Sequence, residues 1–80
     1  MAFRVGYTAN LTEAQFQLER RFKNTRNWKS THAFKSKKEA KSWETDAAKE
    51  MKCDILGPIV GPHRPGDPWF GFVFEHDGPK

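Results

Sequence analysis

The first apolar residues of the chain stand at every second position. Phe3, Val5 and Tyr7 alternate with small or charged neighbours. A period of two is typical of a β-strand that buries one face and exposes the other. We therefore expect the chain to begin with a half-buried strand.

A helical pattern follows this strand. Thr12 and Gln15 have the spacing of a capping box, in which the N-cap side chain bonds an N–H group three residues later and the residue there bonds back. Apolar residues then recur at every fourth position in a narrow stripe of Ala14, Leu18 and Phe22. The pattern predicts a helix with Thr12 as its N-cap that ends near Asn24.

A second strand and a second helix are predicted in the middle of the chain. Residues 28–35 alternate again, and one face of this segment consists of Trp28, Ser30, His32 and Phe34. Ser36 and Glu39 repeat the capping-box spacing. We therefore expect a helix from this point to about Lys52.

On a helical wheel, the second helix sorts its charges by sign. Its apolar stripe consists of Ala40, Trp43, Ala47, Ala48 and Met51. One flank carries Lys38, Lys41, Lys49 and Lys52, and the other carries Glu39, Asp46 and Glu50. Because residues three and four apart are neighbours on a helix surface, one flank is basic along its full length.

The last third of the chain is rich in strand-forming and turn-forming residues. Residues 55–60 predict a strand broken by Gly57 and Pro58, and residues 69–74 are a strongly β-prone run. The segment 61–68 between them is dense in proline and glycine, which is typical of a loop. We expect the two strands to pair as a hairpin around this loop, and the tail to fray from about residue 76.

These patterns predict the element order β-α-β-α-β-β. The expected fold class is α+β, with a small antiparallel or mixed four-stranded sheet and two helices packed on one face. A chain of 80 residues has room for one hydrophobic core, so we expect residues 1–80 to form a single domain.

The composition argues against a disulfide-stabilised, metal-binding or membrane-spanning protein. Cys53 is the only cysteine, so no internal disulfide can form, and the Cys/His spacing of a zinc site is absent from the sequence. No stretch approaches the ~20 apolar residues of a membrane span, and the residues after Met1 lack the apolar run of a signal peptide. We expect a cytoplasmic protein with no metal, no cofactor and no membrane partner.

Positive charge is concentrated in the middle of the chain. The net charge is +4 at pH 7, yet residues 20–41 hold nine bases and one acid. Three aromatic residues interrupt these bases at a spacing of six, namely Phe22, Trp28 and Phe34. Lysine and arginine bind phosphates, and aromatic rings stack on the bases of single strands. The expected surface for an anionic partner consists of Arg20, Arg21, Lys23, Arg26, Trp28, Lys29, Lys38 and Lys41.

This pattern favours a small non-catalytic binding protein with nucleic acid as its partner. An acidic protein surface is an alternative partner, because attraction by charge does not depend on the chemistry of the anion. A different alternative is a protein–protein or self-associating (homodimeric) module. Eleven aromatic residues are many for one small core, and the run 69–74 would pair with a second copy if it lay at a sheet edge.

The loop rich in proline and glycine is a separate candidate site, with His63, Arg64 and Asp67 as its functional residues. Loops of this length are often functional, and prolines reduce the entropy lost when a loop is ordered. The alternative interpretation is a rigid connection. A ligand-binding protein or small enzyme would place a pocket near His63, Arg64 and His76, but the sequence contains no catalytic triad context or phosphate loop, so no catalytic residue is predicted.

Overall fold

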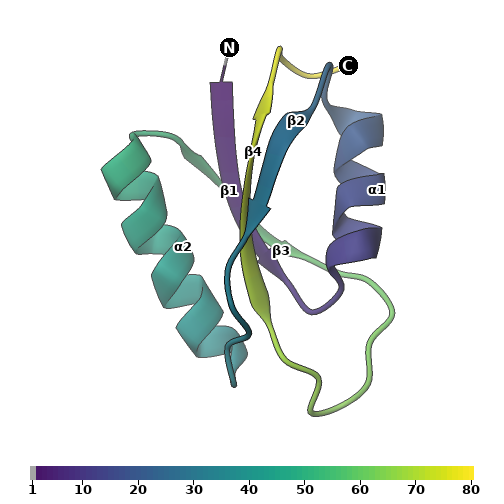
Figure 1. Ribbon diagram of the computed structural model, residues 1–80, viewed down its shortest axis with the longest axis vertical. Helices are drawn as coiled ribbons and strands as arrows, with labels where there is room; N and C mark the ends of the chain where they lie inside the picture. Colours follow the sequence, from purple (N-terminus) through teal and green to yellow (C-terminus); the bar gives the residue numbers. More distant parts are fainter. Residues whose placement is uncertain (1) are drawn as a thin grey trace.

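The computed structural model describes residues 2–80 and contains six elements (Figure 1). They are β1 (Ala2–Thr8), α1 (Leu11–Arg21), β2 (Arg26–Ser30), α2 (Lys37–Met51), β3 (Asp54–Ile59) and β4 (Phe70–His76). The α+β class, the four strands, the two helices and the order β-α-β-α-β-β are confirmed.

The four strands form one mixed sheet in the order β2-β4-β1-β3. β1 pairs with β3 in parallel and with β4 antiparallel, and β2 pairs antiparallel with β4. β1, β2 and β3 therefore run in the same direction, and β4 runs against them.

The hairpin expected between residues 55–60 and 69–74 is wrong, because β1 lies between these two strands. Most residues of β4 are buried, whereas most of β3 is half-buried or exposed. An aromatic strand with little exposed surface is more stable inside the sheet than at its edge. The connecting loop therefore passes from one side of β1 to the other.

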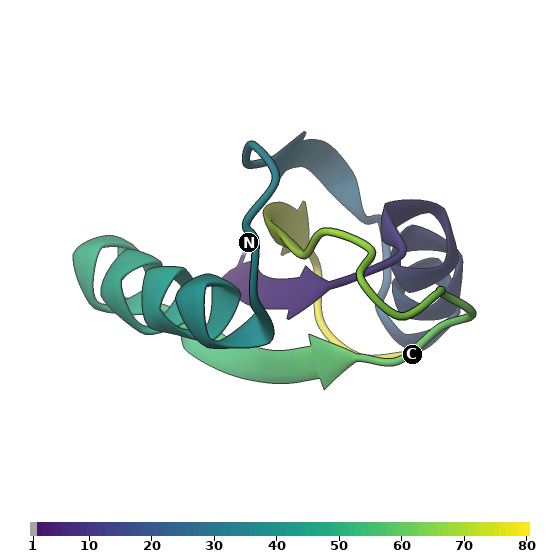
Figure 2. The ribbon, with the colours of Figure 1, turned by 90° about the horizontal axis from the view of Figure 1, so that it is seen from below.

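The helices cover opposite faces of the sheet, which differs from the expected packing on one face (Figure 2). The chain crosses from β1 through α1 to β2 at one edge, and then returns from β2 through α2 to β3 at the other edge. Crossovers between parallel strands are right-handed. Two right-handed crossovers that travel in opposite directions must place their helices on opposite faces.

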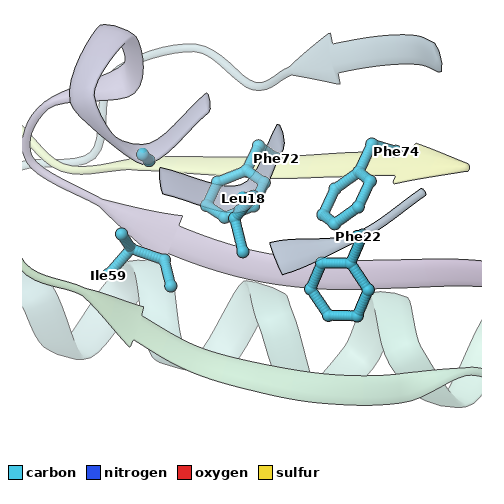
Figure 3. Close-up of a cluster of buried hydrophobic side chains, with 6 residues drawn as sticks. Leu18, Phe22, Ile59, Phe72 and Phe74 are labelled. Atoms are coloured by element: carbon cyan, nitrogen blue, oxygen red, sulfur yellow. The ribbon is translucent and has the colours of Figure 1, made fainter. Parts of the chain in front are cut away.

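The main core lies between α1 and the sheet (Figure 3). Its buried side chains are Ala14, Leu18, Phe22, Ile59, Phe72 and Phe74. Gly6 pairs with Phe72 across the β1–β4 ladder, and a Cβ at this position would lie 2.6 Å from the Phe72 ring. Gly6 therefore makes room for a large ring of the core.

The second face of the sheet packs against α2, and one contact between them is especially close. The Trp43 ring lies so near Gly71 that a side chain there would overlap it. Glu44, on the same helix, is buried, and its carboxylate accepts a hydrogen bond from the Gly57 N–H at 3.1 Å. Burial raises the pKa of Glu44 above its ordinary value, more than this bond and Lys41 lower it.

Two of the predicted helix starts have different outcomes. Ser36 caps α2 as predicted, and its hydroxyl accepts the Glu39 N–H at 3.3 Å. The cap of α1 is Asn10 rather than Thr12, and the side-chain Oδ1 of Asn10 accepts the Glu13 N–H at 3.0 Å. Asparagine is a strong N-cap residue, so it takes this position ahead of Thr12.

The end of the second strand differs from the prediction. β2 ends at Ser30, and beyond it the chain keeps a hydrogen bond from the Thr31 N–H to the Gly71 carbonyl and an isolated bridge at Phe34. Fraying of the tail stays a prediction; in the structure, the tail makes backbone hydrogen bonds. Lys23 exchanges backbone bonds with Asp77 and Gly78, at 2.8 Å each. Backbone groups that pair in this way hold the tail beside the end of α1.

Candidate functional site

The carboxyl ends of the three parallel strands lie at one edge of the sheet. We call this edge, formed by residues 31–41 and 61–69, the carboxyl edge; it faces the viewer in Figure 2. α1 and α2 both begin here, so the positive ends of both helix dipoles point to this side. In sheets with parallel strands, ligands bind outside the carboxyl ends, where the direction of the crossovers reverses.

A backbone bridge joins the two segments of the carboxyl edge. The Phe34 N–H donates to the Trp69 carbonyl at 2.7 Å, and the Trp69 N–H donates to the Phe34 carbonyl at 3.0 Å. This pair connects the approach to α2 with the end of the loop rich in proline and glycine. The bridge therefore holds the lysines of residues 35–41 close to residues 61–69.

Trp69 is the centre of this arrangement. The Lys37 Nζ lies 5.7 Å from the centroid of the Trp69 ring, which is within the range of a cation–π contact. The His63 ring meets the same indole edge-on at 5.6 Å, and the buried Tyr7 ring lies 5.9 Å away. The half-buried indole therefore presents surface at the carboxyl edge while its inner side rests on the sheet.

Phe34 provides a second half-buried ring at this edge. The exposed His32 ring lies 4.9 Å from it, and the Trp43 ring of α2 lies 6.4 Å from it. The carboxyl edge thus combines two aromatic rings with accessible surface.

The charge of the carboxyl edge is positive. Its two segments carry five bases, Lys35, Lys37, Lys38, Lys41 and Arg64, against two acids, Glu39 and Asp67. Within residues 2–80 the ion pairs are Arg4–Asp54 and Arg26–Asp77, so none of these five bases is neutralised by a paired acid. Unpaired cations of this kind remain available to an external anion.

The loop of the carboxyl edge is braced by its own hydrogen bonds. The Asp67 carboxylate accepts the Arg64 N–H at 2.7 Å, and the Asp67 N–H donates to the Arg64 carbonyl at 3.0 Å. The Asn10 amide holds the Pro62 carbonyl at 2.7 Å, which ties the loop to the start of α1. Of the loop residues predicted as functional, His63 and Arg64 are exposed at this edge, whereas Asp67 shapes the loop.

The structure divides the predicted basic surface into two groups. Lys38 and Lys41 belong to the carboxyl edge, at the first turns of α2. The opposite end of the sheet, which we call the amino edge, holds Arg20, Arg21, Lys23 and Arg26 around the end of α1 and the start of β2 (Figure 1). Bases that are close in the sequence are separated in space, because α1 ends at the amino edge whereas α2 begins at the carboxyl edge.

Trp28 and Lys29 lie on β2, between these two groups. The Trp28 ring is half-buried and stacks on Phe74, with centroids 4.3 Å apart and planes inclined by 14°. Phe22, which has the same sequence spacing, is 7% exposed and belongs to the core. Of the three rings spaced six apart, Phe34 is the one that reaches the carboxyl edge.

Four residues of the carboxyl edge were not predicted as site residues from the sequence: Phe34, Lys35, Lys37 and Trp69. The two lysines flank the cap residue Ser36, which is a local signal for a position at the start of a helix. Trp69 has no such signal, because its contact with Lys37 depends on the bridge between distant segments.

The pocket expected near His63, Arg64 and His76 is not formed, because β4 carries His76 to the amino edge. His76 is buried there, its Nδ1 accepts the Gly78 N–H at 2.9 Å, and its Nε2 has no hydrogen-bond partner within the described chain. Burial lowers the pKa of His76, and the Arg4 guanidinium lowers it further.

Residues 2–80 contain no group of three or more histidine, cysteine, aspartate or glutamate side chains placed to hold a metal ion. Within the same residues, neither helix combines the length and apolar character that a membrane crossing requires. The carboxyl edge can supply cations and partly exposed rings to a ligand. No family model, curated protein or solved structure matches the chain.

Proposed function

We propose that this protein is a non-catalytic binding protein that holds a single strand of nucleic acid on its carboxyl edge. The observation that carries the proposal is the position of Lys37 over the Trp69 ring. His63, from the same segment as Trp69, lies against this ring as well. Cations beside an accessible ring match the two chemical parts of a single strand, its phosphates and its bases.

The lysines account for the phosphate part of the proposal. Lys35, Lys37, Lys38 and Lys41 are exposed and make no ion pair among the described residues. Each phosphate that a lysine neutralises releases condensed counterions, so affinity for a strand falls as salt rises. A surface with several free lysines is suited to this kind of binding.

The rings account for the base part. Base–aromatic stacking contributes about 1–3 kcal/mol per base and tolerates different bases. Trp69 and Phe34 are half-buried, so each is held by the fold and still has surface to offer. The backbones of Phe34 and Trp69 are paired, so the fold holds these two residues next to each other.

The amino edge supports the proposal less well. Its Arg26 forms an ion pair with Asp77 at 3.1 Å, and the neighbouring Arg4 pairs with Asp54 at 3.3 Å. Its Phe22 ring is buried, whereas Phe16 is 58% exposed and lies 5.7 Å from the Arg20 guanidinium. The amino edge therefore has one accessible ring beside a base, but Arg26 and the neighbouring Arg4 are already paired with acids.

Self-association through a sheet edge is not favoured by the strand order. Residues 70–74 of the aromatic run belong to β4, which is interior. The edge strand β2 has an irregular register between Arg26 and Lys29, and the edge strand β3 contains Pro58, which has no N–H. Bulges, charges and prolines are the features by which edge strands avoid pairing with another chain.

Binding of a fluorescent mixed-sequence single strand at several salt concentrations tests the proposal. One variant replaces Lys35, Lys37, Lys38 and Lys41 by alanine, and a control variant replaces Arg20, Arg21, Lys23 and Lys80. Both variants remove four positive charges, so they differ in the edge that is altered. We expect the first to bind weakly and to reduce the slope of log K against log salt by about 0.7 for each phosphate that is no longer neutralised.

Equal losses of affinity in both variants would contradict the proposal, because they would show that net charge alone governs binding. Undetectable binding by the wild-type protein at low salt would also contradict it, and would favour an acidic protein as partner.

A cytoplasmic location is part of the proposal. It agrees with the single free Cys53, whose thiol pKa is raised by burial and by Asp54.

A further inference from the structure

A slot of about 230 Å³ lies between α1 and the edge strand β2. It is lined by Leu11, Ala14, Gln15, Trp28, Lys29, Ser30 and Phe72. Leu11 begins α1 and Ser30 ends β2, so one end of the slot adjoins the carboxyl edge.

The apolar part of the slot suits a flat ring. Trp28 and Phe72 form one wall, with ring centroids 6.0 Å apart and planes inclined by 35°, and Leu11 and Ala14 belong to the helix that faces them. A cavity of about 150 Å³ lined by apolar side chains holds benzene. The larger slot therefore has room for one heteroaromatic ring of the size of a nucleobase.

The polar part of the slot can recognise the edge of such a ring. The Gln15 amide both donates and accepts hydrogen bonds, as does the Ser30 hydroxyl. Lys29 also lines the slot, but it pairs with Val73 where Ser30 pairs with Phe72, so its side chain leaves the strand on the other face of the sheet. Across residues 2–80, none of these three side chains makes a hydrogen bond or an ion pair with the protein, and no acid lines the slot.

We propose that this slot receives one nucleobase of the strand bound at the carboxyl edge. The base lies against Trp28, with Gln15 and Ser30 at its polar edge. This inference rests on the proposed function and adds a defined base position to it. The ligand class is a nucleotide unit of a strand, because the slot suits a planar hydrogen-bonding ring and the lysines of the adjoining carboxyl edge suit phosphates.

The experiment follows the indole and backbone amide signals of Trp28 by NMR while adenosine or uridine 5′-monophosphate is added in the millimolar range. Ribose 5-phosphate provides the control that has the anion but lacks the base. We expect both nucleotides to shift the Trp28 signals, and ribose 5-phosphate to leave them unchanged. Equal shifts with ribose 5-phosphate would overturn the inference, because the base would then play no part.

Two variants at one exposed helix position complete the test. Gln15→Trp fills the slot from its rim, and Gln15→Ala leaves it open. Because one stacked base is lost, Gln15→Trp should weaken single-strand binding about 5- to 100-fold. Gln15→Ala removes only the hydrogen bond of the amide and leaves the slot open, so it should weaken binding less than Gln15→Trp does. Amide spectra of both variants establish that the fold is retained.

The two proposals fail in different ways. If the lysine variant loses binding while Gln15→Trp binds a single strand as the wild type does, the slot is overturned and the carboxyl edge is supported. If nucleotides shift Trp28 but the lysine variant binds strands normally, the carboxyl edge is overturned and the slot has to be a separate nucleotide site.

Discussion

The ammonium group of Lys37 lies 5.7 Å above the ring of Trp69, although the two residues come from different thirds of the chain. The contact depends on the backbone bridge between Phe34 and Trp69. It joins the first turn of α2 to the end of the loop that connects β3 with β4. This relationship makes the carboxyl edge one surface, and it is the basis of the first prediction.

Replacing Trp69 by leucine should weaken single-strand binding about 5- to 100-fold, because one stacking ring is removed while the charges are retained. Trp69→Phe keeps a ring and should bind nearly as the wild type does. Fluorescence anisotropy at fixed salt measures both. A leucine variant with wild-type affinity would show that the indole does not contact the strand.

Replacing Gly71 by alanine should destabilise the fold, because its Cβ would overlap the Trp43 ring. Overpacking of this kind costs about 1–3 kcal/mol. The cost should be much smaller in a Trp43→Leu background, where the smaller side chain leaves room. Urea denaturation of the two single variants and the double variant gives this coupling, and additive losses of stability would exclude direct overlap.

Replacing Glu44 by glutamine should stabilise the fold at neutral pH. The pKa of Glu44 is raised by burial, so the folded chain binds more protons than the unfolded chain above the ordinary value of 4.5. The wild-type protein therefore loses stability as the pH rises above 4.5, whereas Glu44→Gln loses none through this group. Glutamine still offers an oxygen to the Gly57 N–H.

Urea denaturation of both proteins between pH 4 and pH 8 checks this prediction. The difference in the free energy of unfolding should increase with pH in favour of the glutamine variant. A difference that stays constant with pH would show that the carboxyl group is not desolvated.

Replacing His76 by phenylalanine should reduce the loss of stability that the wild-type protein shows at acidic pH. The pKa of buried His76 is lowered, so the unfolded chain binds a proton near 6.5 while the folded chain remains neutral to lower pH. The wild-type protein therefore loses stability as the pH falls below 6.5. Phenylalanine fits beside Phe22 and Phe74, which contact the His76 ring.

Thermal melts at pH 7.5 and pH 5.5 measure the effect of His76→Phe. The fall in melting temperature between these two pH values should be smaller in the variant. The comparison between pH values matters more than the absolute stability, because the variant also removes the acceptor of the Gly78 N–H. An unchanged fall would show that His76 takes up its proton equally in both states.

The sequence determined the features of this protein that depend on neighbouring residues. The alternation of Phe3, Val5 and Tyr7 predicted β1, and Ser36 with Glu39 predicted the start of α2. Strand periodicity and helix caps are decided within a few residues, so they can be recognised in a linear pattern. The element order and the α+β class follow from the same local signals.

Tertiary structure decided the features that depend on distant pairings. The position of β1 between β3 and β4 removed the expected hairpin, and two right-handed crossovers in opposite directions placed the helices on opposite faces. The same arrangement separated Arg20 and Arg21 from Lys38 and Lys41, and brought Trp69 to Lys37. Strand order results from competition among all strands for burial, which no local pattern contains.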